Sequence, residues 1–154
     1  MLGWGAISPY SIRYLNDANG TIKNITIKNN IIDPQHADSY FIDIPDSRGY
    51  DDWNADFVCD YNIWGDSVVA APFNWPDSAN KTYAQWLAAK CGDTNSVQTQ
   101  TDPGLNATYY PDSVSDTCVD IGIDLSGTGF DDDKAGTSRP QGSAWDIGCY
   151  EFVQ

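Results

Sequence analysis

The chain carries one strand-like pattern twice, first at residues 22–32, which read Ile22-Lys23-Asn24-Ile25-Thr26-Ile27-Lys28-Asn29-Asn30-Ile31-Ile32. Apolar and polar residues alternate there through Ile27, which is the period of a half-buried β-strand. The pattern returns at residues 57–64, so that Phe57 falls on Ile25, Cys59 on Ile27, Asn62 on Asn30 and Ile63 on Ile31. Strands that recur in register, with an asparagine at the same corner, are typical of a β-solenoid, in which the side-chain amides of stacked coils hydrogen-bond to one another.

Further short strands and one helix complete the predicted element order. Residues 40–44 and 12–15 also have strand patterns, and an antiparallel β-sandwich is the alternative that such recurring strands leave open. Residues 80–91 are predicted to form the one helix, with Ser78 or Asn80 as its N-cap. We therefore expect a single domain in three parts: β-helix coils at 1–66, a loop region with this helix at 67–117, and closing strands at 118–154.

The composition describes an acidic, turn-rich chain. Its 154 residues are enough for one domain, and 22 Asp and Glu against eight Lys and Arg give a formal net charge of −14. Nucleic acid and anionic membrane surfaces bind to basic faces, so the charge argues against both as partners. No stretch approaches the roughly 20 apolar residues of a membrane span. Residues 1–4 do not resemble a signal peptide, so we expect a mature product or part of a longer chain.

The end of the chain is a second distinctive stretch, Arg139-Pro140-Gln141-Gly142-Ser143-Ala144-Trp145-Asp146-Ile147-Gly148-Cys149-Tyr150-Glu151-Phe152. Shorter motifs precede it, in the order Asn29-Asn30-Ile31, Asp60-Tyr61-Asn62, Ala84-Gln85-Trp86, Gly92-Asp93-Thr94-Asn95-Ser96, Asp102-Pro103 and Val119-Asp120-Ile121-Gly122. In these motifs, which cover roughly residues 22–153, the chain resembles the C-terminal part of secreted right-handed parallel β-helix proteins. These are the pectate-lyase-like carbohydrate-active and surface proteins of bacteria.

The resemblance implies an all-β fold, a right-handed parallel β-helix of few coils with one short helix and a loop-rich C-terminal closing region. It also implies a secreted or cell-surface setting. Within the closing segment, Trp145, Ile147 and Cys149 are expected to face inward or to pair, and Arg139 is expected to be structural.

The four cysteines are widely spaced and lack the C-x-x-C pair of zinc and redox sites. An even number in a turn-rich acidic domain favours two disulfides and an oxidising compartment. Of the three pairings that four cysteines allow, we expect Cys118–Cys149 and Cys59–Cys91. Cys149 stands where the family usually has alanine, which supports a local bridge to Cys118.

Catalytic candidates are few. Lyases on this fold use an arginine or lysine base beside carboxylates that hold Ca²⁺, and only Arg48 has such carboxylates close in sequence, Asp51 and Asp52. The same two aspartates are a candidate pair for glycoside hydrolysis, which needs two carboxylates about 5–9 Å apart. The N-T-D, G-H-G and R-I-K motifs of the family's polygalacturonases are absent, and a solvated loop is the alternative for all three residues.

One acidic loop is a candidate metal site. Asp131, Asp132 and Asp133 precede Gly136 in the order of an EF-hand loop, but Ala135 and Gly142 stand where two oxygen ligands are needed, so a true EF-hand is excluded. An irregular Ca²⁺ site here, or at the aspartates near residue 51, is the alternative to a solvated turn. No other cofactor is expected.

Aromatic rings beside polar groups are how proteins hold sugars, because the ring covers the C–H face of the sugar. Aromatic residues gather between positions 50 and 75, and we predict a carbohydrate-binding face formed by Tyr50, Trp53, Tyr61, Trp64 and Trp75. Tyr109 and Tyr110 lie in another predicted loop. The expected function is that of a non-catalytic carbohydrate-binding domain of a secreted or cell-surface polysaccharide-processing protein, with polysaccharide as its partner.

Two other functions are alternatives: a polysaccharide lyase or glycoside hydrolase fragment, and a structural or filament-forming subunit that self-associates through the ends of its β-helix. The chain also contains four N-x-S/T sequons, which would carry glycans only in a glycosylating host. They begin at Asn19, Asn24, Asn80 and Asn106.

Overall fold

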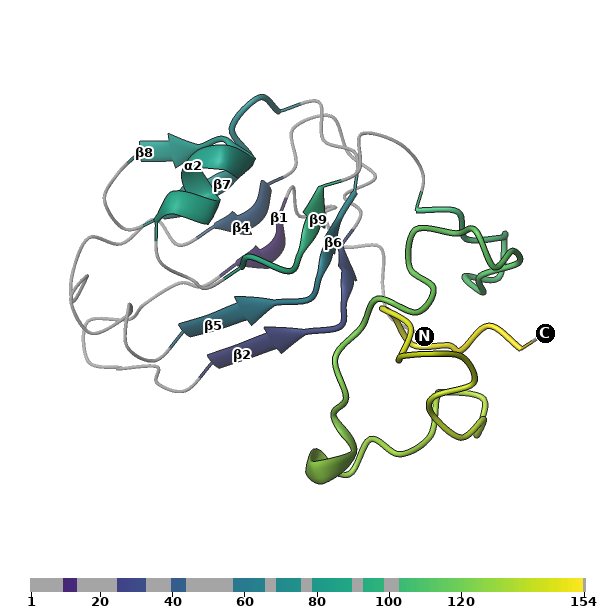
Figure 1. Ribbon diagram of the computed structural model, residues 1–154. Coiled ribbons are helices and arrows are strands. Elements are labelled where there is room, and N and C mark those ends of the chain that lie inside the picture. The colour runs from purple at the N-terminus through teal and green to yellow at the C-terminus, as the bar shows by residue number, and fades with distance from the viewer. Residues whose placement is uncertain are drawn as a thin grey trace, which may run out of the picture.

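The computed structural model describes residues 10–13, 25–32, 40–43, 57–65, 69–75, 79–89, 93–98 and 103–153. The elements in these ranges are β1 (Tyr10–Arg13), β2 (Ile25–Lys28), β3 (Ile31–Ile32), β4 (Tyr40–Asp43), β5 (Phe57–Asp60), β6 (Ile63–Trp64), β7 (Phe73–Trp75), β8 (Ala79–Lys81), helix α2 (Tyr83–Ala88), β9 (Val97–Gln98) and the 3₁₀ turn η1 (Ser126–Thr128). The regular structure is therefore mostly strand with one short helix, as expected (Figure 1). Within these ranges, no helix has the length and apolar character needed to cross a membrane.

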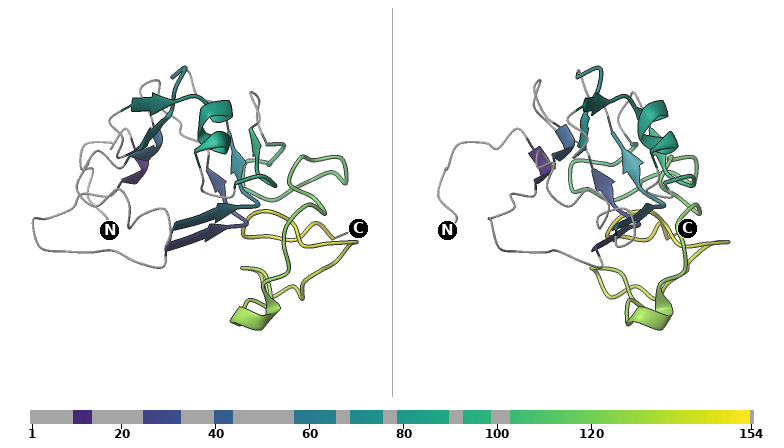
Figure 2. Two further views of the ribbon diagram at one scale, coloured as in Figure 1. Left: turned by 60° about the vertical axis from the view of Figure 1, so that its left-hand side comes forward. Right: turned by 90° about the vertical axis from the view of Figure 1, so that its left-hand side faces the viewer.

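The strands form three sheets, in which almost all neighbours are parallel. The orders are β1-β4-β7-β8, β2-β5 and β3-β6-β9, and among the described strands the single antiparallel pair is β7 with β8. From β1 to β7, consecutive strands thus enter different sheets, and β4, β5 and β6 pair with β1, β2 and β3 in turn (Figures 1 and 2). The parallel pairing excludes the antiparallel sandwich for the described part of the chain.

The predicted register between the repeated segments is confirmed. Ile25 pairs with Phe57, Ile27 with Cys59 and Ile31 with Ile63. Asn62 is fully buried at the corner between β5 and β6, and its Oδ1 accepts hydrogen bonds from the backbone N–H of Asn30 at 3.0 Å and from its side-chain amide at 3.3 Å. This is the asparagine contact that the repeat predicts.

The corner divides what the pattern suggests is one continuous strand. Asn29 and Tyr61, which pair across the corner through a 2.8 Å bond from Asn29 N–H to Tyr61 O, both have a φ of 54°. A left-handed residue ends a strand, and asparagine adopts this conformation more readily than other non-glycine residues. Residues 25–32 therefore form two short strands, β2 and β3, that turn into different sheets.

The core has two parts, one on each side of the β3-β6-β9 sheet. Ile32 and Trp64 face an aromatic cluster with Phe41, Phe57, Phe73 and Trp86. Ile63, the residue before Trp64, faces the other side, where it packs with Cys118, Val119 and Ile147. Alternation along β6 therefore gives two buried residues in succession, because this sheet is covered on both faces.

The C-terminal region supplies that second cover, but it does so without forming strands. Residues 118–153 contain the 3₁₀ turn η1 and two isolated antiparallel bridges, Gly122 with Trp145 and Asp132 with Ser138, so the predicted closing strands at 118–154 are wrong as strands. The region is anchored to Asn29, whose side chain exchanges hydrogen bonds of 2.7 and 2.9 Å with the backbone of Ile123 and whose carbonyl accepts from Gly148 N–H at 2.9 Å. Figure 2 shows this region beside the strands.

The helix is shorter than predicted and begins later. It spans Tyr83–Ala88, because residues 79–81 form β8 along β7. The N-cap is Thr82 and not Ser78 or Asn80: its hydroxyl accepts from Gln85 N–H at 3.3 Å, while the Gln85 side chain accepts from Thr82 N–H at 2.9 Å. This reciprocal pair is a capping box.

Replacing Thr82 with alanine should therefore lower the free energy of unfolding by about 1 kcal/mol, because one N-terminal amide of the helix loses its acceptor. Chemical denaturation followed by tryptophan fluorescence measures this change. The matched control is Thr117→Ala, an exposed threonine outside the helix, and an equal loss in the two variants would contradict the capping role of Thr82.

Candidate functional site

The structure removes Trp64 from the predicted carbohydrate-binding face. Its side chain is fully buried and its indole N–H donates to Asp93 Oδ2 at 2.8 Å, so the prediction of a ligand contact at Trp64 is wrong. Tyr61 is half-buried at the corner between β5 and β6. Trp75 is the last residue of β7, but its side chain is not among the described groups. Tyr50 and Trp53 lie outside the described residues.

Several other predictions also fall outside the described residues. They concern Arg48, Asp51, Asp52, Cys91, Asn19 and Asn24. Of the two remaining sequons, Asn80 is exposed and donates to the Tyr40 hydroxyl at 3.0 Å. Asn106 is half-buried, and its Oδ1 accepts from Thr108 and Tyr110 within one tight turn.

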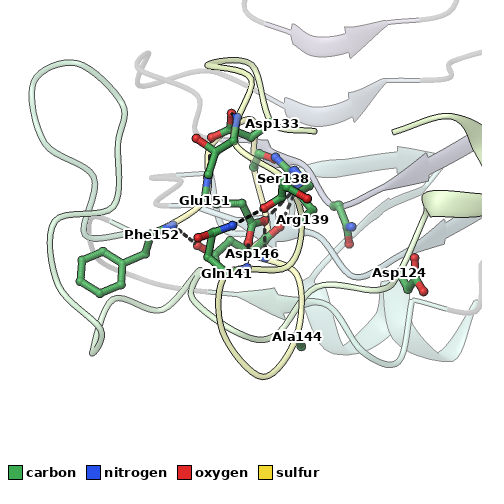
Figure 3. Close-up of polar contacts among 12 residues, drawn as sticks. Asp124, Asp133, Ser138, Arg139, Gln141, Ala144, Asp146, Glu151 and Phe152 are labelled. Atoms are coloured by element: carbon green, nitrogen blue, oxygen red, sulfur yellow. Dashed lines mark hydrogen bonds and ion pairs between the residues drawn. The ribbon is translucent and has the colours of Figure 1, made fainter. Parts of the chain in front are cut away.

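The residues of the closing motif are engaged with one another (Figure 3). The guanidinium of Arg139 donates to the carbonyls of Gly148 at 3.0 Å and Asp146 at 3.4 Å, and it lies 3.5 Å from Glu151 Oε1. The same group lies 5.2 Å from the centroid of the Trp145 ring, which adds a cation–π contact. Arg139 is therefore structural, as predicted.

The carboxylates of this motif accept backbone amides. Asp146 accepts from Asp120 N–H at 2.8 Å and from Phe152 N–H at 2.6 Å, while Glu151 accepts from Asp146 N–H at 3.0 Å and Gln141 N–H at 3.1 Å. Burial raises the pKa of both carboxyl groups, and these hydrogen bonds and Arg139 oppose that rise. The arrangement organises irregular backbone, and these carboxylates are not presented to a ligand.

Two glycines of the motifs allow this close packing. A methyl group at Gly142 would overlap the Asp120 carboxylate, which accepts from Ala144 N–H at 3.0 Å. A methyl group at Gly122 would lie 2.8 Å from Trp145 O, and Gly122 N–H donates to that oxygen at 2.6 Å. The two motifs thus fit against each other at positions where only glycine has room.

One of the three aspartates of the acidic loop, Asp133, has a structural role. Asp133 is buried, and its carboxylate accepts from Ala135 N–H at 2.8 Å, Thr137 N–H at 2.7 Å and Glu151 N–H at 3.0 Å. Burial opposes ionisation of Asp133, but these amides outweigh it and lower the pKa. Asp131 and Asp132 are exposed, and no group of three or more His, Cys, Asp or Glu in the described ranges is placed to hold a metal ion.

The predicted Cys118–Cys149 disulfide is not formed. Both thiols are free, with Cys118 buried beside Ile147 and Cys149 exposed. Trp145 and Ile147 face inward as predicted, but Gly148 has a φ of 119° and ends the alternation, so Cys149 points away. Burial raises the pKa of the Cys118 thiol to about 12, which keeps it protonated.

An open cleft lies between the corner of β2 and β3 and the loops that follow residue 103. Its volume of about 1390 Å³ exceeds the roughly 300–1,000 Å³ typical of pockets for small ligands, which leaves room for more than one sugar ring. Side chains that could contact a ligand line it from segments far apart in the sequence, namely Lys28, Asn30, Tyr109, Phe130, Lys134 and Tyr150.

The aromatic residues of this cleft differ in their surroundings. Tyr109 is 71% exposed and Phe130 is 62% exposed, although both are large apolar rings. Tyr150 stacks on Tyr110, and the Lys134 ammonium lies 5.5 Å from the centroid of the Tyr150 ring. The cleft therefore offers uncovered ring faces next to hydrogen-bond donors.

The sequence predicted a loop at Tyr109 but no binding site there, and it predicted no ligand-binding role for Phe130 or Tyr150. Phe130 was visible as one aromatic residue within a loop of Gly, Ser, Thr and Asp. An apolar ring in such a loop is a signal for a contact surface. No comparable signal joins it to Lys28, which lies a hundred residues away at the corner of β2 and β3.

Comparison with known proteins identifies no relative: no family model, no curated protein and no solved structure matches the chain.

Proposed function

We propose that this chain binds polysaccharide in the cleft, as a non-catalytic domain of a secreted or cell-surface polysaccharide-processing protein. The observation that carries the proposal is the exposure of the Tyr109 and Phe130 rings within one large cleft. Such rings can cover the C–H faces of sugars. Lys28 and Lys134 line the same cleft and provide donors for sugar hydroxyl oxygens or carboxylates, and the amide oxygen of Asn30 provides an acceptor for a sugar hydroxyl.

We also infer that the three sheets, whose strands are parallel except for β8, are the faces of a short right-handed parallel β-helix. Strands β1, β2 and β3 are followed by β4, β5 and β6 in the same three sheets, which is the order that a coiling chain produces. Crossover connections between parallel strands are right-handed in about 98% of cases. The hydrogen bonds between Asn30 and Asn62 support the same arrangement, because they join equivalent corners of successive coils. The secreted setting rests on the resemblance of the closing motif.

Phe130→Ala tests the proposed site. Loss of one stacking ring should weaken binding about tenfold, which corresponds to about 1.4 kcal/mol. Affinity electrophoresis in a panel of neutral and acidic polysaccharides identifies a ligand for the unmodified protein and then compares the variants on that ligand. Tyr109→Ala should act in the same direction.

The matched control is Val114→Ala, because Val114 is a 59% exposed apolar residue that does not line the cleft. Its retention should equal that of the unmodified protein. Retention of Phe130→Ala at the unmodified level, or failure of the unmodified protein to bind any polysaccharide of the panel, would refute the proposal.

A further inference from the structure

Tyr110 and Tyr150 are stacked, although they come from two segments that are distant in the chain. Their ring centroids are 3.6 Å apart and their planes differ by 18°. Tyr110 belongs to the loop closed by the bridge between Leu105 and Pro111, and Tyr150 belongs to the closing motif. The phenol rings therefore lie one over the other.

The position of this pair makes it open to chemical modification. Both side chains are only half-buried, and neither belongs to the two buried clusters of the core. With the centroids 3.6 Å apart and the planes nearly parallel, the two rings overlap, so the ring carbons ortho to each hydroxyl lie against the other ring. These are the carbons that carry unpaired spin when a phenol loses one electron and its proton.

We propose that Tyr110 and Tyr150 form an oxidative cross-linking site that yields dityrosine. Each phenol gives up one electron and one proton, and the two tyrosyl radicals join through their ortho carbons. The hydrogen on each joined carbon then moves to the phenolic oxygen, so that two C–H bonds are replaced by one C–C bond. The two electrons and two protons pass to hydrogen peroxide, through a haem peroxidase, and reduce it to two water molecules.

The cross-link would fasten a part of the chain that has little regular structure. Residues 103–153 contain one 3₁₀ turn and isolated bridges, and Cys118 and Cys149 are free. A bond between residues 110 and 150 closes a long loop and so restricts the unfolded chain, as a disulfide would. It also fixes one wall of the cleft. This site does not depend on carbohydrate binding.

The test treats the full chain with a haem peroxidase and limiting hydrogen peroxide at low protein concentration. We expect dityrosine fluorescence in a monomeric product that is lighter by two hydrogen atoms. Trypsin should leave Tyr110 in a peptide of residues 91–134, with Tyr109 as its one other tyrosine. Tyr150 is the single tyrosine of the next peptide, because the bond between Arg139 and Pro140 resists cleavage. Mass spectrometry should find these two peptides joined.

Tyr150→Phe and Tyr110→Phe should each abolish this product, with the near-ultraviolet circular dichroism of each variant confirming that it is folded. Tyr109→Phe is the matched control: Tyr109 is 71% exposed and adjacent to Tyr110, yet its removal should leave the yield unchanged. The proposal is overturned if Tyr109→Phe abolishes the link, if Tyr150→Phe retains it, or if only cross-linked dimers form.

Discussion

Asp93→Ala is expected to lower the free energy of unfolding by roughly 3–5 kcal/mol. The Asp93 carboxylate is fully buried, and its Oδ2 accepts the indole N–H groups of Trp64 at 2.8 Å and Trp86 at 2.7 Å. Its Oδ1 accepts the hydroxyl of Ser96, which in turn accepts from Asn62 N–H at 2.7 Å. Alanine leaves these buried donors without an acceptor, and each unsatisfied donor costs about 1–3 kcal/mol of stability.

Denaturant unfolding followed by tryptophan fluorescence measures the loss, since both indoles report on the site. Asp131→Ala is the control, because Asp131 is an exposed aspartate and its removal should change stability by no more than about 0.5 kcal/mol. A loss below 1 kcal/mol in Asp93→Ala would show that the indoles find other acceptors.

Asp93→Asn separates the charge of this group from its hydrogen bonds. One amide oxygen can accept both indoles, and the amide nitrogen can donate to Ser96, so the asparagine variant should be much more stable than the alanine variant. Burial raises the pKa of Asp93 above its usual value of 3.8, and the hydrogen bonds from Ser96, Trp86 and Trp64 partly oppose that rise.

Because the folded protein holds this proton more tightly than the unfolded chain, the stabilisation from Asp93 is full below the unfolded pKa and is lost as pH rises through the folded pKa. Asparagine does not titrate. The stability of the unmodified protein relative to Asp93→Asn should therefore fall as pH rises from about 3.8 toward neutrality. Unfolding curves across this range test the sign, and a relative gain with rising pH would contradict it.

The parallel pairing of the sheets could be predicted from the sequence because the information is local and repeated. Alternation in 22–32 and 57–64 assigns the faces, and the matching asparagines fix the register of Asn62 against Asn30. The motif at residues 92–96 was visible too, but its physical reason was not. Asp93 and Ser96 act on Trp64, Trp86 and Asn62, which come from other parts of the chain.

The candidate site could not be predicted in the same way. Trp64 looks like a loop aromatic, but it is fully buried because the rings of Phe41 and Phe73, from other segments of the chain, pack against it. The cleft joins Lys28 to Phe130, and no local pattern reports such a distant contact. In the closing motif, the resemblance implied that Cys149 faces inward or pairs, but the chain turns at Gly148, which has a positive φ, and Cys149 is exposed.

Arg139→Ala is the second substitution with a large expected effect, a loss of about 3–5 kcal/mol of stability in the C-terminal region. The side chains of Arg139 and Glu151 are only 6% and 1% exposed, so removing the guanidinium leaves a buried carboxylate without its cation. It also removes the donors to the carbonyls of Gly148 and Asp146 and the contact with Trp145. Arg139→Lys keeps the charge but not the planar guanidinium, so the stability of this variant should lie between that of the unmodified protein and that of Arg139→Ala.

The loss from Arg139→Ala should be local and should depend on pH. Amides of Ile147 and Gly148, which bond to Cys118 and Asn29, should exchange with solvent much faster, whereas amides of β5 should keep their protection.

Burial already raises the pKa of Glu151, and Arg139 opposes the rise. Without the arginine the folded pKa rises further, so the loss should be greatest at neutral pH and should shrink on acidification. Glu151→Gln in the same background should restore part of the stability at neutral pH, since it removes the unpaired charge. Equal loss at all pH values, or no rescue by glutamine, would mean that Arg139 acts through packing on Trp145 and not through Glu151.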